Sequence, residues 1–214
     1  MAAQESTKFW NQAAGTKTFT HPLDHARLAQ ARARDARILD FGCGQGRLCG
    51  ELVQLGFTAV VGVDSSPEMI RAAQARVPGA SFVLSDGGAL PFAAGSFDAA
   101  LLFAVLTCIP DDQAQKNLLA EFKRTLRPGG LLLISDYPLQ TDARNLDRYA
   151  KFAHEAGGPG SFRLREGTLL RHHRREWFTE LLADFEIEAA IELDVSTMNG
   201  NPARIAQFWC RRFA

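Results

Sequence analysis

The chain has 214 residues, which is enough for one well-buried domain and too few for two ordinary ones. Apolar residues make up 46% and charged residues 22%, a balance typical of a folded globular protein and not of a disordered or fibrous chain. Because 24 basic residues balance 24 acidic ones, the formal net charge is zero, which argues against a general electrostatic attraction to nucleic acid or to an anionic membrane.

The first part of the chain alternates short apolar strands with amphipathic helices. Residues 38–41 are expected to form a strand that runs into a glycine cluster, and a helix follows over 48–55 to a glycine stop. Residues 58–63 form the second strand, after which Ser66 and Pro67 supply the N-cap and the first residue of a helix that ends near Arg76. The pattern is therefore a repeated unit of strand, turn and helix.

The next segments continue this alternation. Residues 81–84 are expected to form the third strand, and residues 97–103 form a fourth strand that is apolar on both faces, as an interior strand of a parallel sheet should be. Asp111 and Asp112 open a helix to about Leu126, a Pro-Gly-Gly sequence at 128–130 breaks it, and residues 131–135 supply a fifth strand.

The last third of the chain departs from this rhythm and then returns to it. Residues 138–174 are expected to be an insertion that forms a helical lid over the carboxyl edge of the sheet, shielding the substrate together with the amino-terminal segment. A helix at 175–183 and strands at 185–193 and 203–211 follow, and the short link between these two strands requires antiparallel pairing.

These elements predict a doubly wound α/β fold with a mostly parallel, seven-stranded sheet and an antiparallel last strand. The whole chain, 1–214, is expected to be one domain. Its parts are an amino-terminal cap and helix at 1–35, a cofactor-binding half at 36–136, the lid insertion at 138–174, and a carboxyl-terminal helix with two strands at 175–214.

The glycine cluster after the first strand points to a ligand site. Gly42, Gly44 and Gly46 follow directly on the strand, where the backbone of an open α/β sheet turns sharply and meets its ligands. Asp40, just before the turn, is placed to attract an ammonium group. A tight turn alone would explain one glycine, but the βα context favours a binding site.

Acidic residues end the next two strands. Asp64 is placed to accept hydrogen bonds from both hydroxyls of a ribose, because Ser66 already provides the helix N-cap. Asp86 is suited to accept a bond from an adenine amino group, and the Gly87 amide to donate to a ring nitrogen. An ordinary turn remains the alternative for this last pair.

Four segments, in order, resemble the motifs of class I S-adenosylmethionine-dependent methyltransferases, in particular the small-molecule branch that includes the ubiquinone and menaquinone enzymes. They are LDFGCGQGRL, VVGVDSSPEMI, FVLSDGGALPFAAGSFDAALL and LRPGGLLLISD. The resemblance implies S-adenosylmethionine as cofactor, with S-adenosylhomocysteine as product. It implies a set of cofactor-binding residues: Asp40, Gly42, Cys43, Gly44 and Gly46 around the methionine part, Asp64, Ser65 and Met69 at the nucleoside, Asp86 and Gly87 at adenine, and the Phe103 carbonyl at the amino group.

Catalytic residues are harder to assign. Many relatives carry a histidine pair shortly after the fourth strand, where this chain has Leu-Thr-Cys-Ile at 106–109. A general base is needed only when the acceptor must lose a proton, so alignment of donor and acceptor is expected to be the main effect. His172 or His173 is a candidate to bind substrate or take that proton, and His21 in the amino-terminal cap is another. The alternative for the adjacent pair is a basic surface turn, and at most one of the two is expected to face a pocket.

Other functions remain open at this point. A nicotinamide-dependent oxidoreductase would want a third glycine where Arg47 stands, and a non-catalytic binder of the cofactor is possible with the same motifs. The nucleic-acid methyltransferase signatures are missing, which favours a small-molecule acceptor over DNA or RNA. The four cysteines lack zinc spacing, so no metal is expected, and the amino terminus lacks a secretion signal. We therefore expect a cytoplasmic monomer or homodimer without a membrane partner.

Overall fold

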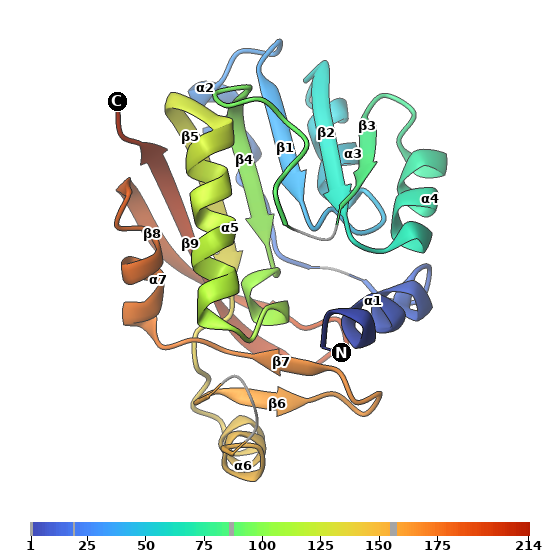
Figure 1. The fold of residues 1–214 in the computed structure, drawn as a ribbon, viewed down its shortest axis with the longest axis vertical. Coiled ribbons are helices and arrows are strands. Elements are labelled where there is room, and N and C mark those ends of the chain that lie inside the picture. The colour runs from blue at the N-terminus through green and yellow to red at the C-terminus, as the bar shows by residue number, and fades with distance from the viewer. Residues whose placement is uncertain (1, 19, 86–87, 155–157) are drawn as a thin grey trace.

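The computed structural model describes residues 2–18, 20–85, 88–154 and 158–214. Its main sheet has seven strands: β1 (Arg37–Phe41), β2 (Ala59–Asp64), β3 (Ser81–Leu84), β4 (Phe97–Phe103), β5 (Leu126–Asp136), β8 (Phe185–Ser196) and β9 (Pro202–Arg212). The strand order is β3-β2-β1-β4-β5-β9-β8, and β9 runs antiparallel to both of its neighbours, β5 and β8 (Figure 1). This confirms the doubly wound, mostly parallel sheet expected from the sequence.

Helices cover both faces of this sheet, as the alternating connections require. The helices are α1 (Ala2–Ala13), α2 (His25–Ala31), α3 (Arg47–Gln54), α4 (Pro67–Arg76), the 3₁₀ turn η1 (Leu106–Cys108), α5 (Asp112–Thr125), α6 (Ala143–Lys151) and α7 (Arg175–Leu181). Apolar side chains of α5 and α7 pack on one face of the sheet, and those of α2, α3 and α4 pack on the other.

Two hydrophobic cores result from the period of two along the central strands. In β1, Leu39 and Phe41 point into the core beneath α5, whereas Ile38 points into the core beneath α3. In β4, Leu101 and Leu102 divide in the same way, and both are fully buried. The central strands are therefore apolar on both faces, as the sequence indicated.

Local signals set most element boundaries. The Ser66 side chain accepts a hydrogen bond from the Met69 amide at 3.1 Å and Pro67 occupies the first turn, so α4 begins where the sequence predicts. Strand β5 begins at Leu126, five residues before the expected start at 131. The reason is that Pro128 disfavours helix at the residue before it, so α5 ends at Thr125 and the chain is already extended at Leu126.

The segment 138–174 differs from the helical lid that we expected. It contains α6 and a separate two-stranded sheet of β6 (Ser161–Arg163) and β7 (Leu169–Arg171), paired antiparallel. Strands of three residues are too short to give a readable period in the sequence. Figure 1 shows this hairpin and α1 facing the carboxyl ends of β1, β2 and β4, with α6 beyond the hairpin. None of the described helices is long and apolar enough to cross a membrane.

Candidate active site

A cavity of about 630 Å³ lies at the carboxyl ends of β1, β2 and β4. The volume is within the range of about 300–1,000 Å³ that is usual for small-molecule sites. The carboxyl ends of the strands form the edge of an open α/β sheet at which ligands bind. The amino-terminal segment and the 138–174 segment contribute to its walls, with Trp10 and His21 from the first and Phe162 and His172 from the second.

Most of the cofactor-binding residues predicted from the sequence line this cavity. They are Asp40, Gly42, Cys43, Gly44, Asp64, Ser65, Met69 and Phe103. Gly46 is not among the lining residues. It caps α3 with φ +79°, and a Cβ there would lie 3.2 Å from the Ala73 Cβ, so its small size serves the packing of α3 against α4. Asp86 and Gly87 lie outside the described residues.

The glycine turn is held by the end of β2. The amides of Gly42 and Cys43 both donate to the Val63 carbonyl, at 2.8 and 2.9 Å. Gly42 has φ +71°, and a Cβ at this position would lie 2.4 Å from Cγ2 of Val105. Both the left-handed conformation and the close approach of Val105 therefore require glycine at position 42.

Asp64 connects the turn to the next helix. One carboxylate oxygen accepts from the Gly44 amide at 2.9 Å, and the other accepts from the Ser66 amide at 2.9 Å. Burial raises the pKa of Asp64 above its ordinary value, and these amide bonds oppose part of that rise. The amides fix the orientation of the carboxylate, whose remaining lone pairs can accept bonds from ligand hydroxyls.

Asp40 is the second acidic residue at this end of the cavity. Its side chain is 1% exposed and accepts a hydrogen bond from the Cys49 thiol at 3.2 Å. Burial raises the pKa of Asp40 to about 6. A ligand cation beside it would favour the ionised form and lower that pKa, which is the behaviour expected of an ammonium-binding carboxylate.

The end of β4 carries backbone strain that the sequence does not reveal. Ala104 has φ +57°, the only left-handed residue other than glycine in the described part of the chain. Its amide donates to the Ser135 carbonyl at 2.7 Å, and Phe103, Ala104 and Val105 all line the cavity. A left-handed alanine costs about 1–2 kcal/mol, and such strain is often found at functional sites.

His21 lines the cavity, and one of its ring nitrogens has no hydrogen-bond partner among the described residues. Its Nδ1 lies 2.9 Å from the Ser135 hydroxyl and 3.1 Å from the Ser135 carbonyl. Because a carbonyl only accepts, Nδ1 carries the proton, and Nε2 is left with a lone pair. Nε2 is buried and has no hydrogen-bond partner within the described residues. Burial lowers the pKa of His21 to about 4, so the ring is neutral at pH 7.

The adjacent histidines point in different directions, as expected for neighbours in an extended segment. His172 lines the cavity, with Nδ1 2.6 Å from the Tyr149 hydroxyl and Nε2 3.4 Å from Nη2 of Arg148. His173 is fully buried and does not line the cavity. Its Nε2 donates to the Leu106 carbonyl at 3.2 Å. A basic surface turn at this pair is excluded because both rings are buried.

Several cavity residues were missed by the sequence reasoning. Tyr137, directly after β5, lies between two candidate histidines, with ring centroids 4.8 Å from His21 and 5.1 Å from His172. Arg148 and Phe162 come from the insertion, in which the sequence pattern did not locate the individual helix and strands. The position of Tyr137 after the fifth strand was the one usable signal, since carboxyl ends of parallel strands face the ligand.

Comparisons with known proteins agree with this geometry. Residues 39–134 match the family described as methyltransferase domain. The chain is 35% identical over 165 residues to trans-aconitate 2-methyltransferase of Azoarcus sp., a match that covers 76% of this chain and 58% of that protein. It is 33% identical over 135 residues to ubiquinone biosynthesis O-methyltransferase of Xanthomonas oryzae pv. oryzae, covering 59% and 55%. The chain thus spans a little more than half the length of these two relatives.

Solved structures show the same fold. A methyltransferase from Methanosarcina mazei, described as dependent on S-adenosylmethionine, is similar with a TM-score of 0.81 and 26% identity, covering 87% of this chain and 97% of that one. The 1,6-didemethyltoxoflavin-N1-methyltransferase of Burkholderia thailandensis, solved with its substrate and S-adenosylhomocysteine, has a TM-score of 0.63 and 22% identity over 98% and 79% of the two chains. With its glycine turn and its sheet order, the chain has the fold of the S-adenosylmethionine-dependent methyltransferases, and its residues 39–134 match the methyltransferase domain family.

Proposed function

We propose that this chain binds S-adenosylmethionine in the cavity and transfers its methyl group to a small molecule held beside it. The observation that carries the proposal is the continuity of the cavity. One space is lined at one end by the glycine turn with Asp64, and at the other by the 138–174 segment with Phe162. A donor and an acceptor can therefore meet in one cavity. The names of the two curated relatives, which describe methylation of small molecules, support this reading.

The residues at the glycine turn fit the chemistry of this cofactor. Asp64 would accept bonds from the ribose hydroxyls, and Asp40 would attract the ammonium group. Ser65 and Met69 would lie at the nucleoside, and the Phe103 carbonyl would face the amino group. When bound, S-adenosylmethionine supplies a methyl group already activated on a sulfonium. The protein then needs to align the acceptor and to manage any proton that the acceptor loses.

Among the three histidines considered, His21 is our choice for the proton acceptor. The proton on its Nδ1 is fixed by Ser135, and its free Nε2 is the basic atom. His172 has both ring nitrogens engaged, by Tyr149 and Arg148. His173 lies outside the lining of the cavity, so we assign it a structural role.

We propose further that the amino-terminal segment and residues 138–174 shield the reaction from water, since both border the cavity. The cytoplasm is the proposed location. All four cysteines are free thiols, in keeping with a reducing compartment. The proposed partner is a small organic molecule, taken up by a monomer or a homodimer.

Titration calorimetry with S-adenosylmethionine, S-adenosylhomocysteine and NAD separates the competing functions. We expect one site per chain for the first two ligands and no heat with NAD. Binding of NAD alone would overturn the proposal in favour of an oxidoreductase. Conversion of bound S-adenosylmethionine to S-adenosylhomocysteine in the presence of an acceptor library would separate an enzyme from a non-catalytic binder.

A further inference from the structure

The cavity has a basic end opposite its acidic end. Asp40 and Asp64 border it at the glycine turn, whereas Arg144 and Arg148 of α6 border it at the insertion. An acidic wall suits the cationic groups of the cofactor proposed above. The proposed cofactor contacts do not involve the basic wall, so its positive charge suits a second, anionic ligand.

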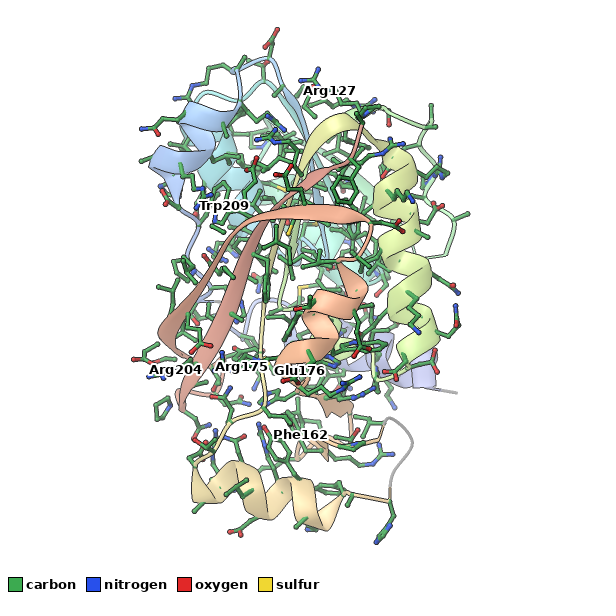
Figure 2. All side chains as sticks on the ribbon, turned by 90° about the vertical axis from the view of Figure 1, so that its left-hand side faces the viewer. Arg127, Phe162, Arg175, Glu176, Arg204 and Trp209 are labelled. Carbon is green, nitrogen blue, oxygen red and sulfur yellow. The ribbon has the colours of Figure 1, made fainter. Side chains whose placement is uncertain are left out.

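Arg148 is the residue whose surroundings are most informative. Its guanidinium carbon lies 3.4 Å from the ring centroid of Phe162, on β6. Figure 2 shows Phe162 between α6 and the rest of the molecule. Arg148 lies over this ring and lines the cavity. The side chain is half-buried, and burial lowers its pKa below the ordinary value for arginine. A positive charge in such a place is normally matched by a carboxylate.

No carboxylate within ion-pair distance of Arg148 is found in the described part of the chain. Its Nη2 donates instead to the neutral Nε2 of His172 at 3.4 Å, and its buried Nε has no hydrogen-bond partner among the described residues. Arg47, another arginine that lines the cavity, differs in this respect, because it pairs with Glu51 at 2.7 Å.

His172 is suited to hold Arg148 in this position without neutralising it. Burial lowers the pKa of His172 well below its ordinary value, and the positive charge of Arg148 lowers it further. The imidazole is therefore neutral and can accept from the guanidinium. Its other side is fixed by the Tyr149 hydroxyl at 2.6 Å and by stacking on Tyr137. Arg148 thus remains a positioned cation without an ion-pair partner among the described residues, although the more distant Asp142 carboxylate acts on its charge.

We propose that the acceptor molecule carries a carboxylate and that Arg148 binds it. The guanidinium is planar and matches a carboxylate in geometry and charge. The neighbouring walls are apolar, with Phe162, Leu164 and Leu170 on the hairpin side, so the body of the acid is apolar. Arg144, which is exposed and lies 3.8 Å from Asp142, adds positive charge at the same end. This inference rests on the proposed function, because it concerns the acceptor half of the same cavity.

Matched pairs of acids and amides test the proposal. The probes are benzoate with benzamide, cinnamate with cinnamamide and hexanoate with hexanamide, each titrated into the protein saturated with S-adenosylhomocysteine and followed by ligand-observed NMR. We expect at least one acid to bind at least tenfold more tightly than its amide. Phenyl phosphate is the further arm, and tighter binding of it than of every acid would overturn the carboxylate assignment in favour of a phosphate.

Three variants locate the binding group. Arg148→Gln should reduce the preference for the acid to less than twofold, and Arg148→Lys should keep part of it because the charge is retained. Arg204→Gln is the matched control, since Arg204 is exposed, pairs with Asp194 and does not line the cavity. It should bind the acids as the unaltered protein does. If Arg148→Gln fails to fold, as judged by circular dichroism, the lysine variant and the acid–amide ratios of the unaltered protein remain decisive.

The outcomes are separable from those of the proposed function. Binding of S-adenosylhomocysteine without any preference for acid over amide would overturn the carboxylate proposal alone. An unchanged preference in Arg148→Gln would show that another group binds the acid and would overturn the assignment to Arg148. Failure to bind S-adenosylhomocysteine would remove the proposed function, whereas the acid preference, measured then without it, would still report on Arg148.

Discussion

Replacing Gly42 with alanine tests why the cofactor turn needs glycine. Two physical demands meet at this residue. Its φ of +71° is left-handed, and a Cβ would lie 2.4 Å from Cγ2 of Val105. The first demand costs an alanine about 1–2 kcal/mol of folding free energy. The second is an overlap in a packed region, which typically costs a further 1–3 kcal/mol, so we expect Gly42→Ala to destabilise the protein by about 2–5 kcal/mol.

Gly129 provides a control with the same backbone angle. Its φ is also +71°, but nothing lies within 4 Å of the position that a Cβ would take. Gly129→Ala should therefore cost only the conformational part, about 1–2 kcal/mol. The difference between the two variants measures the contact with Val105. Removing the overlapping methyl groups with Val105→Ala should bring the cost of Gly42→Ala in the double variant down to that of Gly129→Ala.

Urea unfolding at pH 7, followed by circular dichroism, gives the free energies for the four variants and the unaltered protein. Equal losses of unfolding free energy for Gly42→Ala and Gly129→Ala would refute this prediction, because the contact with Val105 would then contribute no destabilisation. The same conclusion would follow if Val105→Ala left the cost of Gly42→Ala unchanged. Calorimetry with S-adenosylhomocysteine should show weaker binding for Gly42→Ala than for Gly129→Ala, since only Gly42 lines the cavity.

Three further predictions follow from named contacts. Asp64→Ala should weaken S-adenosylhomocysteine binding, measured by calorimetry, by about 1.5–3 kcal/mol, because a charge-assisted hydrogen bond is lost. It should also lower the stability of the protein, because Asp64 accepts hydrogen bonds from the Gly44 and Ser66 amides. Unchanged affinity would show that Asp64 does not contact the ligand. His21→Asn should lower the turnover of an acceptor that loses a proton by about 10²–10⁴-fold. Because the pKa of His21 is about 4, the rate of the unaltered enzyme should fall only as the pH drops through about 4. A variant as active as the unaltered enzyme would contradict the role of His21. Burial lowers the pKa of His173 to about 4, so the unfolded chain binds more protons than the folded one between pH 4 and 6.5, and this residue makes stability rise with pH by at most about 3 kcal/mol. His21 and His172, whose pKa values burial also lowers, contribute a rise of the same sign, and Asp136, whose pKa burial raises to about 7, contributes the opposite trend. Urea titrations should therefore show a smaller rise for His173→Gln than for the unaltered protein, and an identical pH dependence would contradict the prediction.

The sheet and its helices could be predicted because their signals are local. The Ser66 N-cap, the interior pattern of residues 97–103 and the glycine turn each lie within a few consecutive residues. The same holds for the cofactor end of the cavity, where carboxyl-terminal strand residues necessarily meet at one edge. The role of Gly46 could be predicted only in part. Its positive φ could be expected, but its contact with Ala73 depends on how α3 packs on α4.

The acceptor end could not be predicted for a different reason. The sequence suggested that His172 and His173 are equivalent candidates at ordinary pKa, but their environments differ through contacts far along the chain. His172 meets Tyr149 and Arg148 of α6, whereas His173 meets the Leu106 carbonyl after β4. Burial lowers the pKa of both rings, and no pattern of neighbouring residues reports that burial.

A series of ring contacts connects His21, the proposed proton acceptor, with Arg148, the proposed carboxylate-binding residue. The rings of His21, Tyr137, His172 and Phe162 follow one another with centroids 4.8, 5.1 and 4.8 Å apart, and Arg148 lies over the last ring. These side chains come from the amino-terminal segment, the end of β5 and the insertion, so no one segment determines their order. Because each ring is packed against the next, the separation between the proton acceptor and the anion-binding guanidinium is fixed by the fold. An acid bound at Arg148 would therefore present the rest of its body at a set distance from Nε2 of His21, which is the alignment that methyl transfer requires.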